Sequence, residues 1–383
     1  MNIPFHRSYT LQDDIDQVVD TLKSGWLTMG PKTIDFETRF AKEVKSQFAV
    51  SCSSGTAAMH LALKAIDLKA GDEVIIPDMT FTATGEVVRY FDAMPVLADI
   101  ERDTFNIDVR QIEKHITPRT KAIIPVHMAG QSCDMDEIME IAKNHNLKVI
   151  EDAAHCFPTY YKSKPVGAIG DITAFSFYAT KTIACGEGGM ATTQNEEYAK
   201  TMKMLRLHGI SKDAWKRYSN EGSWFYEVVE AGYKYNMTDI QAGLGIAQLN
   251  KANDVWELRK KIAKMYNDAF ATSECLDLPF IKTDRETSWH LYIIRLKTER
   301  LKISRNEFIE KLKNKGVNTS VHFIPLHYHP YYKENIPHNT ADLKNSEWVF
   351  ERNISLPIYP GMTVGEVEYV CNAVLDICRQ NEK

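Results

Sequence analysis

Between residues 48 and 193, short β-branched runs alternate with segments of helical periodicity, and this alternation restricts the fold more than any other feature. Seven runs have strand length: FAVSCSS, DEVIIPD, PVLADI, KAIIPVHM, LKVIEDA, ITAFSFY and GGMATT. Intervening segments such as TAAMHLALKAI and DMDEIMEIAKNH repeat apolar residues at helical spacing. Alternating strands and helices predict an α/β fold with a mostly parallel sheet flanked by helices. Several runs are apolar throughout, as expected of strands covered on both faces.

The length of the chain predicts a second, smaller domain, since 383 residues exceed one ordinary core. We expect a large α/β domain over residues 1–250 and a small α+β domain over 251–383. TDIQAGLGIAQLNKANDVWELRKKIAKMYNDAF predicts one long helix with Thr238 as its N-cap. Further on, we expect a strand at SWHLYIIRL, a helix at SRNEFIEKLKNKG closed by Gly316, a strand at VNTSVHFI and a last helix near 363–380.

Residues 205–235 are polar, rich in aromatic side chains and without clear period. A loop of that length inside a compact domain is usually functional or disordered. We interpret it as a candidate lid over a site.

Charge and composition argue against several classes of protein. The net charge is −5 and no segment is strongly basic, which disfavours nucleic acid as the main partner. Apolar runs are far shorter than the roughly 20 residues of a membrane helix, and the N-terminus lacks the features of a signal peptide, so we expect a cytoplasmic protein. The seven cysteines form no CxxC pair and are interpreted as reduced thiols. His322, His327 and His329 lack nearby acidic or thiol ligands, so no metal site is expected.

SCSSGTAAMHLAL, residues 51–63, predicts an anion site. A strand ends there and Ser53, Ser54, Gly55 and Thr56 open a helix, whose free N–H groups and dipole attract negative charge. The alternative is a plain N-cap, which Ser and Thr supply in any protein.

VIEDAAH and FSFYATK each contain a side chain that could take part in chemistry, Asp152 and Lys181 respectively. Asp152 follows a buried-type strand, at the sheet edge where α/β folds bind ligands, although an N-cap aspartate is the alternative. Lys181 follows an aromatic run, and apolar surroundings favour the neutral amine that covalent chemistry needs. A solvated surface lysine is the alternative. The glycines of CGEGGM allow close backbone approach.

Together, these three segments supply a phosphate cradle, a carboxylate and an amine. Pyridoxal phosphate (PLP) needs all three: an anion clamp, an acid that keeps its ring nitrogen protonated, and a lysine that binds it covalently. The sequence therefore predicts a PLP site.

The chain also resembles the DegT/DnrJ/StrS sugar aminotransferases over nearly its whole length. The matching motifs are LKSGWLTMGPKTIDFE, SGTAAMHLAL, GDEVIIPDMTFTAT, IIPVHMAGQSCDMD, VIEDAAH, FSFYATKTIACGEGGM, GYKYNMTDIQAG and VHFIPLHYHPYY, in that order. EDAAH and GYKYN make it most similar to the UDP-4-amino-4-deoxy-L-arabinose–oxoglutarate aminotransferase type. The CFPT segment at 156–159 departs from the usual pattern.

This resemblance implies a fold-type I homodimer with active sites shared at the subunit interface. It places Lys181 on the lysine that binds PLP and Asp152 on the acid beside the ring nitrogen. Other implied cofactor contacts are His155 beside Asp152, Gly55, Thr56 and Ser176 at the phosphate, Phe81 on the ring, and Asn236 from the other subunit. Substrate contacts are implied for Trp26, Thr28, Met29, His322 and Phe323.

The implied function is transfer of an amino group from glutamate to a keto-sugar nucleotide, with a UDP-4-keto sugar expected, for cell-surface glycan or lipid A synthesis. Dehydratase relatives carry histidine where this chain keeps Lys181, which favours transamination. Three alternatives stay open: another PLP enzyme acting on amino acids, a non-catalytic PLP-binding regulator, and an α/β domain without a cofactor.

Overall fold

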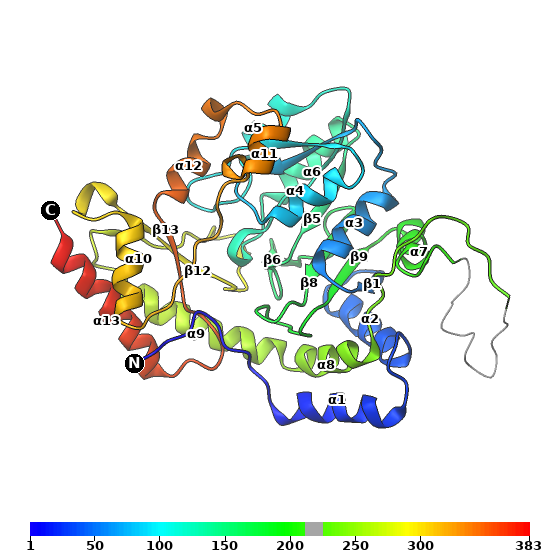
Figure 1. Ribbon diagram of the computed structural model, residues 1–383, viewed down its shortest axis with the longest axis horizontal. Helices are drawn as coiled ribbons and strands as arrows, with labels where there is room; N and C mark the ends of the chain where they lie inside the picture. The colour runs from blue at the N-terminus through cyan, green and yellow to red at the C-terminus, as the bar shows by residue number, and fades with distance from the viewer. Residues whose placement is uncertain (211–224) are drawn as a thin grey trace.

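A seven-stranded sheet forms the centre of the protein, whose computed structural model describes residues 1–210 and 225–383 (Figure 1). Strand order across the sheet is β1-β9-β8-β5-β4-β2-β3. All seven predicted runs form its strands: β1 (Phe48–Cys52), β2 (Glu73–Pro77), β3 (Met94–Ala98), β4 (Thr120–Ile123), β5 (Lys148–Asp152), β8 (Ile172–Ser176) and β9 (Gly189–Thr193). Strand β9 pairs antiparallel with both β1 and β8, whereas the other pairs are parallel. The predicted α/β fold is confirmed.

Helices cover both faces of this sheet, as alternate residues of β2 demonstrate. Val74 and Ile76 pack into one hydrophobic cluster with α3, α4 and α7, and Ile75 packs into another with α5 and α6. Helices α2 and α8 cover the β1–β9–β8 part of the second face. The helices are α1 (Gln12–Ser24), α2 (Pro31–Glu43), α3 (Gly55–Ala65), α4 (Thr82–Arg89), α5 (Val109–Ile112), α6 (Met135–Asn144), α7 (Glu196–Leu205) and α8 (Asp239–Asn250).

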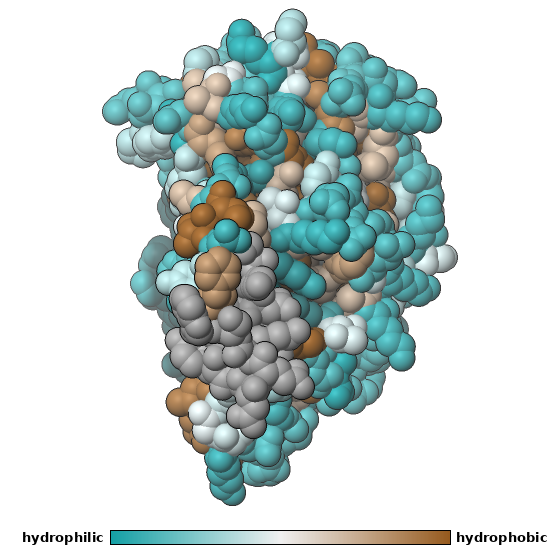
Figure 2. All heavy atoms as spheres, turned by 90° about the vertical axis from the view of Figure 1, so that its right-hand side faces the viewer, coloured by the Kyte–Doolittle hydropathy of each residue, from teal (hydrophilic) through white to brown (hydrophobic). Residues whose placement is uncertain are grey.

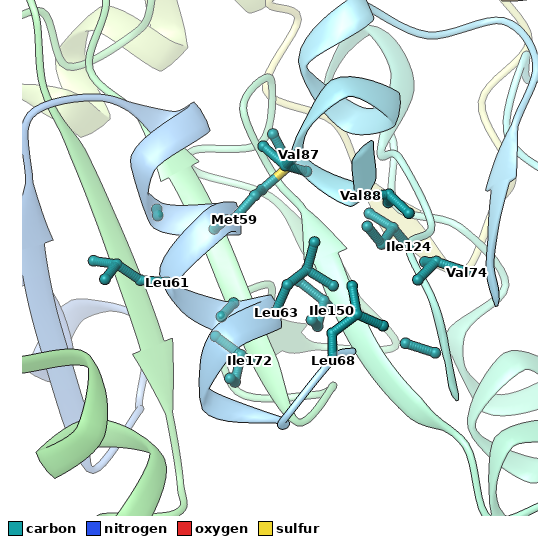
Figure 3. Packing of buried hydrophobic residues seen from close by; sticks show 14 of the residues in the cluster. Met59, Leu61, Leu63, Leu68, Val74, Val87, Val88, Ile124, Ile150 and Ile172 are labelled. Atoms are coloured by element: carbon teal, nitrogen blue, oxygen red, sulfur yellow. The ribbon is translucent and has the colours of Figure 1, made fainter. Parts of the chain in front are cut away.

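Helix α3 lies across the sheet and carries much of the first cluster. Figure 3 shows Met59 beside Val87 of α4, and Leu63 beside Ile150 of β5. Burying side chains of this size contributes about 1.5–3 kcal/mol each relative to leaving them exposed. This packing fixes the N-terminal end of α3 relative to the carboxyl end of β5.

A second, three-stranded sheet lies at the other end of the molecule (Figure 1). It consists of β10 (Leu276–Asp277), β12 (Tyr292–Leu296) and β13 (Asn353–Leu356), and packs with α9 (Ala252–Phe270), α10 (Arg305–Asn314) and α13 (Val364–Asn381). Its core also takes Ile3 from the N-terminus. A short sheet of β6 (Tyr160–Tyr161), β7 (Lys164–Pro165) and β11 (Arg285–Glu286) and the helices α11 (Pro330–Asn335) and α12 (Lys344–Phe350) complete the elements that position the site.

Two predicted elements of the C-terminal half are wrong. The long helix is broken at Lys251, where the backbone leaves helical geometry between α8 and α9, because the buried Lys251 amine pairs with Asp13 and Asp14 of α1. The expected strand at VNTSVHFI is not a regular strand, since it forms only isolated bridges at Val317 and Ser320. Strand β13 lies between this segment and β12, since β13 pairs with β12 and bridges to Ser320 through Ser355.

Hydrophilic residues predominate on the face at the right of Figure 1, with hydrophobic residues in small separate groups (Figure 2). In the described parts of the chain, no helix is long and apolar enough to span a bilayer. The predicted lid at 205–235 lies partly outside the described residues. Within them, its two ends pair at Leu207 with Lys234 and at Ile210 with Val228.

Candidate active site

A cavity of about 410 Å³ lies at the carboxyl ends of the parallel strands. Open α/β sheets bind ligands at this edge, and the volume suits a small organic molecule. Strand β5 delivers Asp152 to the cavity, and β8 delivers Ser176. The predicted residues that line it are Gly55, Thr56, Phe81, Asp152, His155, Ser176, Lys181, His322 and Phe323.

The N-terminus of α3 forms one wall of the cavity. Ser54 caps the helix, with its Oγ accepting the N–H of Ala57 at 3.0 Å and its carbonyl accepting the N–H of Ala58. Gly55 and Thr56 line the cavity, and their N–H groups are donors that the cap does not use. Ser176 lies against Gly55, where an added Cβ would come within 3.0 Å of the serine Cβ.

Gly189 shows the close backbone approach predicted for the CGEGGM glycines, and its neighbour is the backbone of Ser54 and Gly55. A Cβ there would lie 2.2 Å from the carbonyl oxygen of Ser54 and 2.6 Å from the nitrogen of Gly55. Glycine at this position lets β9 pack directly against the backbone of the cradle. The strand next to β1 thus supports the predicted anion site.

Asp152 is buried and has two hydrogen-bond donors. Its Oδ2 accepts the hydroxyl of Thr84 at 2.9 Å, and its Oδ1 accepts the N–H of Ala154 at 3.1 Å. Burial raises the pKa of Asp152, and both hydrogen bonds oppose that shift. Since the two oxygens offer about four lone-pair sites, this carboxylate has capacity for a further donor from the cavity.

Lys181 extends into the cavity from the segment after β8. Its Nζ lies 3.4 Å from Nε2 of His290. Burial lowers the pKa of the Lys181 amine to about 8, with the charge of Asp152 opposing and that of Arg259 adding to the shift. A usable fraction of the neutral, nucleophilic amine is therefore present near neutral pH.

Aromatic rings form the other walls. The His155 ring stacks on Phe323 at 5.9 Å between centroids, and Phe81, which is 59% exposed, lies 5.8 Å from Phe323. Within the described residues, Nδ1 of His155 is buried without a hydrogen-bond partner. Such an atom needs a partner that a ligand can provide. The CFPT segment continues from His155 into the core, where Phe157 packs on Phe40.

The remaining predicted residues gather in a second group outside the cavity. Asn236 and Thr238 precede α8, and Asp239 holds the turn before α2: its Oδ1 accepts the N–H of Gly30 at 2.7 Å and its own N–H donates to Thr28. Trp26 and Met29 belong to the same turn, joined by a hydrogen bond from the indole N–H to the Met29 carbonyl. The structure brings the two predicted segments together, and none of these predicted residues lines this chain's own cavity.

Sequence reasoning missed several lining or supporting residues: His6, Thr84, Tyr178, Arg259 and His290. Thr84 lies three residues after Phe81 on α4, and helical spacing toward the cavity was a usable signal for it. His290 precedes a strand in an apolar run, where no local pattern marks it. Among the described residues, no group of three or more His, Cys, Asp or Glu is arranged to hold a metal.

The arrangement fits PLP on chemical grounds. Backbone N–H groups at Gly55 and Thr56 suit a phosphate, and Asp152 has room for the N–H of a protonated ring nitrogen. The unpaired Nδ1 of His155 suits a polar ring substituent, and Lys181 supplies the amine.

Comparison with known proteins identifies relatives along the whole chain. Residues 9–375 match the model of the DegT/DnrJ/EryC1/StrS aminotransferase family. An uncharacterized protein of Methanocaldococcus jannaschii is 55% identical over 379 residues, covering 99% of this chain and 98% of the relative. The spore coat polysaccharide biosynthesis protein SpsC of Bacillus subtilis is 47% identical over 378 residues, covering 98% and 97%.

Solved structures give the same result. The putative sugar aminotransferase Spr1654 from Streptococcus pneumoniae, in its PMP form, is 36% identical with a TM-score of 0.93, covering 99% of this chain and 100% of that one. Its PLP form is also solved. PseC of Helicobacter pylori, an aminotransferase involved in pseudoaminic acid biosynthesis, is 27% identical with a TM-score of 0.92, covering 99% and 100%. The chain therefore belongs to the DegT/DnrJ/EryC1/StrS aminotransferase family and is a PLP-dependent transaminase of fold type I.

Proposed function

We propose that the protein transfers an amino group from glutamate to the ketone of a nucleotide-linked sugar, a UDP-4-keto sugar in the first instance, in the cytoplasm. The observation that carries this proposal is the convergence of Lys181, Asp152 and the Gly55–Thr56 cradle on one cavity. Sugar substrates are supported by the names of the relatives, which refer to sugar aminotransferases, polysaccharide and pseudoaminic acid. Similarity to the L-arabinose type rests on EDAAH and GYKYN.

When bound, PLP supplies an electron-withdrawing ring that stabilises negative charge on the carbon beside the transferred nitrogen. Asp152 holds the proton-bearing nitrogen of that ring, and the N–H groups of Gly55 and Thr56 hold its phosphate. Phe81 restrains one face of the ring. These contacts orient the reacting carbon toward Lys181.

Lys181 has two roles in this proposal. Its Nζ would hold the cofactor covalently in the resting enzyme, and the same Nζ, when free, would act as the base that takes the proton from the α-carbon of glutamate and as the acid that returns it to the cofactor. A base for that transfer must lie within hydrogen-bond reach, which a displaced cofactor lysine does. Its lowered pKa, about 8, suits a group that alternately accepts and releases a proton near neutral pH.

A homodimer with shared sites completes the proposal. Asn236 and the Trp26–Met29 turn lie together outside this chain's cavity, which is where residues destined for a neighbour's site would lie. We assign Asn236 to the partner's phosphate, and Trp26, Thr28 and Met29 to its sugar entrance. His322 and Phe323 would meet the same substrate from the chain that owns the cavity.

The function is tested in two half-reactions. Glutamate alone should bleach the cofactor absorbance of the loaded protein, and a panel of keto-sugar nucleotides should then restore it with formation of an aminated sugar detected by mass spectrometry. A protein that consumes other amino acids and aminates no sugar nucleotide would contradict the proposal.

Shared sites are tested by mixing two inactive variants. Lys181→Ala and Asn236→Asp protomers, dissociated and reassociated together, should recover about a quarter of wild-type activity, because mixed dimers contain one intact site. No recovery, with mixed dimers demonstrated by mass spectrometry, would place all contacts within one chain.

A further inference from the structure

We propose that this active site has two further positioning residues: the imidazole of His290 holds the Lys181 amine, and the guanidinium of Arg259 holds the backbone of His290. The inference rests on the proposed role of Lys181 as the reacting amine. Neither residue is marked by the sequence pattern, and they come from different elements: Arg259 lies on α9, and His290 precedes β12.

His290 lies where it can accept a hydrogen bond from the lysine. Its Nε2 is 3.4 Å from Nζ of Lys181, its ring lines the cavity, and only 6% of the residue is exposed. Burial, and then the positive charge of Lys181, lowers the pKa of His290 well below its usual range. A neutral imidazole has one donor and one acceptor nitrogen, so Nε2 accepts from Lys181 when the ring proton is on Nδ1.

The neighbours of His290 favour the arrangement in which Lys181 donates and the imidazole accepts. The charged or titratable groups that face it are Lys181, His155, His322 and Arg259. His155 lies 4.5 Å away between ring centroids and limits the movement of the imidazole. None of these four groups is a carboxylate, so none of them favours the doubly protonated ring that would deprive Lys181 of its acceptor.

Arg259 fixes the backbone on which His290 sits. One of its terminal nitrogens donates to the carbonyls of Trp289 and His290, both at 3.3 Å, and of Ile358 at 2.9 Å. His290 and Ile358 line the cavity, so this guanidinium ties two of its walls together.

Arg259 is also a buried charge without a counter-ion. It is 1% exposed, forms no ion pair within the described residues, and its Nε has no partner there. Arg259 and Lys181 both line a second, very small cavity behind the site. A buried, unpaired guanidinium is costly to the fold, so its position behind the reacting amine suggests a use beyond packing: its charge favours the neutral form of Lys181.

The experiment uses cofactor-free protein, so that it does not depend on turnover. Trace acetic anhydride labels lysines only when they are neutral, and mass spectrometry of the Lys181 peptide gives the pH at which its labelling is half-maximal. In the wild-type protein this midpoint should lie near pH 8. Two pairs of variants then distinguish the hydrogen bond of His290 and the charge of Arg259 from the packing of their side chains.

For His290, Phe retains a ring against His155 but has no acceptor, and Gln retains an acceptor near the position of Nε2. His290→Phe should lower the Lys181 midpoint by about one pH unit, because a hydrogen bond that favours the ammonium is lost, while His290→Gln should leave it unchanged. In loaded enzyme, His290→Phe should lower kcat about tenfold at constant KM for glutamate, and His290→Gln should retain most of kcat.

For Arg259, Met removes the charge and Lys retains it. Arg259→Met should raise the midpoint by about one unit, opposite to His290→Phe, and Arg259→Lys should not. If Arg259→Met does not fold, as judged by its circular dichroism, the His290 pair decides alone. Midpoints that fail to move in these directions, or equal effects of Phe and Gln at 290, would overturn the inference. Absence of a borohydride-reducible bond between PLP and Lys181 would instead overturn the proposed function.

Discussion

Glu151 and Asp152 are neighbours at the end of β5, but they belong to two buried polar regions of different character. Because successive strand residues face opposite sides, Glu151 points away from the cavity into a closed network. Its oxygens accept from His127 Nε2 at 2.9 Å, the Thr173 hydroxyl at 2.6 Å and the Gly170 N–H at 2.8 Å. Asp152 faces the cavity with only two donors.

The two carboxyl groups respond oppositely to burial. Burial favours the neutral form of both, but in Glu151 the hydrogen bonds, led by that of His127, outweigh it and lower the pKa. In Asp152 burial prevails and raises the pKa. The comparison teaches that one network is complete and stabilises the fold, whereas the other is left incomplete and acquires its last donor from a ligand.

Lys181→Ala should have the largest effect. Turnover should fall by at least about 10⁴-fold, since the variant loses both the covalent anchor and the base, with the far-ultraviolet circular dichroism unchanged. Borohydride treatment of the PLP-loaded variant should attach no cofactor to the peptide containing position 181. Normal amination of a keto sugar by this variant would show that the cavity is not the reactive region.

Asp152→Asn should have the next largest effect. It tests directly whether Asp152 differs in role from Glu151. Turnover should fall by about 10²–10³-fold, because an amide supports the ring proton poorly. The free energy of unfolding of the cofactor-free protein should be unchanged or slightly higher, since a buried charge with few partners is removed. A large loss of stability in urea would mean that Asp152 belongs to the structural region after all.

Glu151→Gln should give the reverse outcome. The free energy of unfolding should fall by about 2–3 kcal/mol, because one oxygen acceptor of a closed buried network becomes a donor. Turnover per folded molecule should stay within about twofold of wild type. Denaturant unfolding combined with active-site titration measures both quantities, and a turnover loss similar to that of Asp152→Asn would remove the distinction between the regions.

Lys181→Met in cofactor-free protein should have the smallest effect, and its sign depends on pH. The folded pKa, about 8, lies below the ordinary 10.5, so folding penalises the charged amine, and Met should stabilise the protein by about 1–2 kcal/mol at pH 7. Between about pH 8 and 10.5 the unfolded chain holds a proton that the folded chain has released, so wild type gains stability and the difference shrinks. Thermal unfolding at pH 7 and pH 10 measures it, and a difference independent of pH would contradict the lowered pKa.

Much of the large sheet and of the cavity could be predicted because the signals are local. Strand runs end at Asp152 and Ser176, and a helix start at Gly55 follows another strand, so the parallel topology alone brings these residues to one edge. Their contacts with the cofactor stay predictions.

What sequence reasoning could not supply depends on contacts between distant segments. The break between α8 and α9 comes from Lys251 meeting Asp14, some 237 residues away, and helical periodicity on both sides conceals it. Likewise, His290 meets Lys181 over 109 residues of chain, and residues 317–324 meet β13 through a bridge between Ser320 and Ser355 without forming a regular strand. The hydrophobic periodicity of a segment contains no information about such distant partners.

The close packing of Gly189 on the Ser54–Gly55 peptide has a further consequence. Because the protein's own backbone shapes this cradle, we expect it to be formed before the cofactor binds, so that loading of cofactor-free protein should require no refolding. Once in every catalytic round the amino donor would displace Lys181 from the cofactor, and until the lysine bonds it again the cradle would hold the cofactor without a covalent bond. Substitution of Gly189 should therefore weaken cofactor binding more than it slows the reaction, so that the diluted enzyme loses its cofactor during turnover.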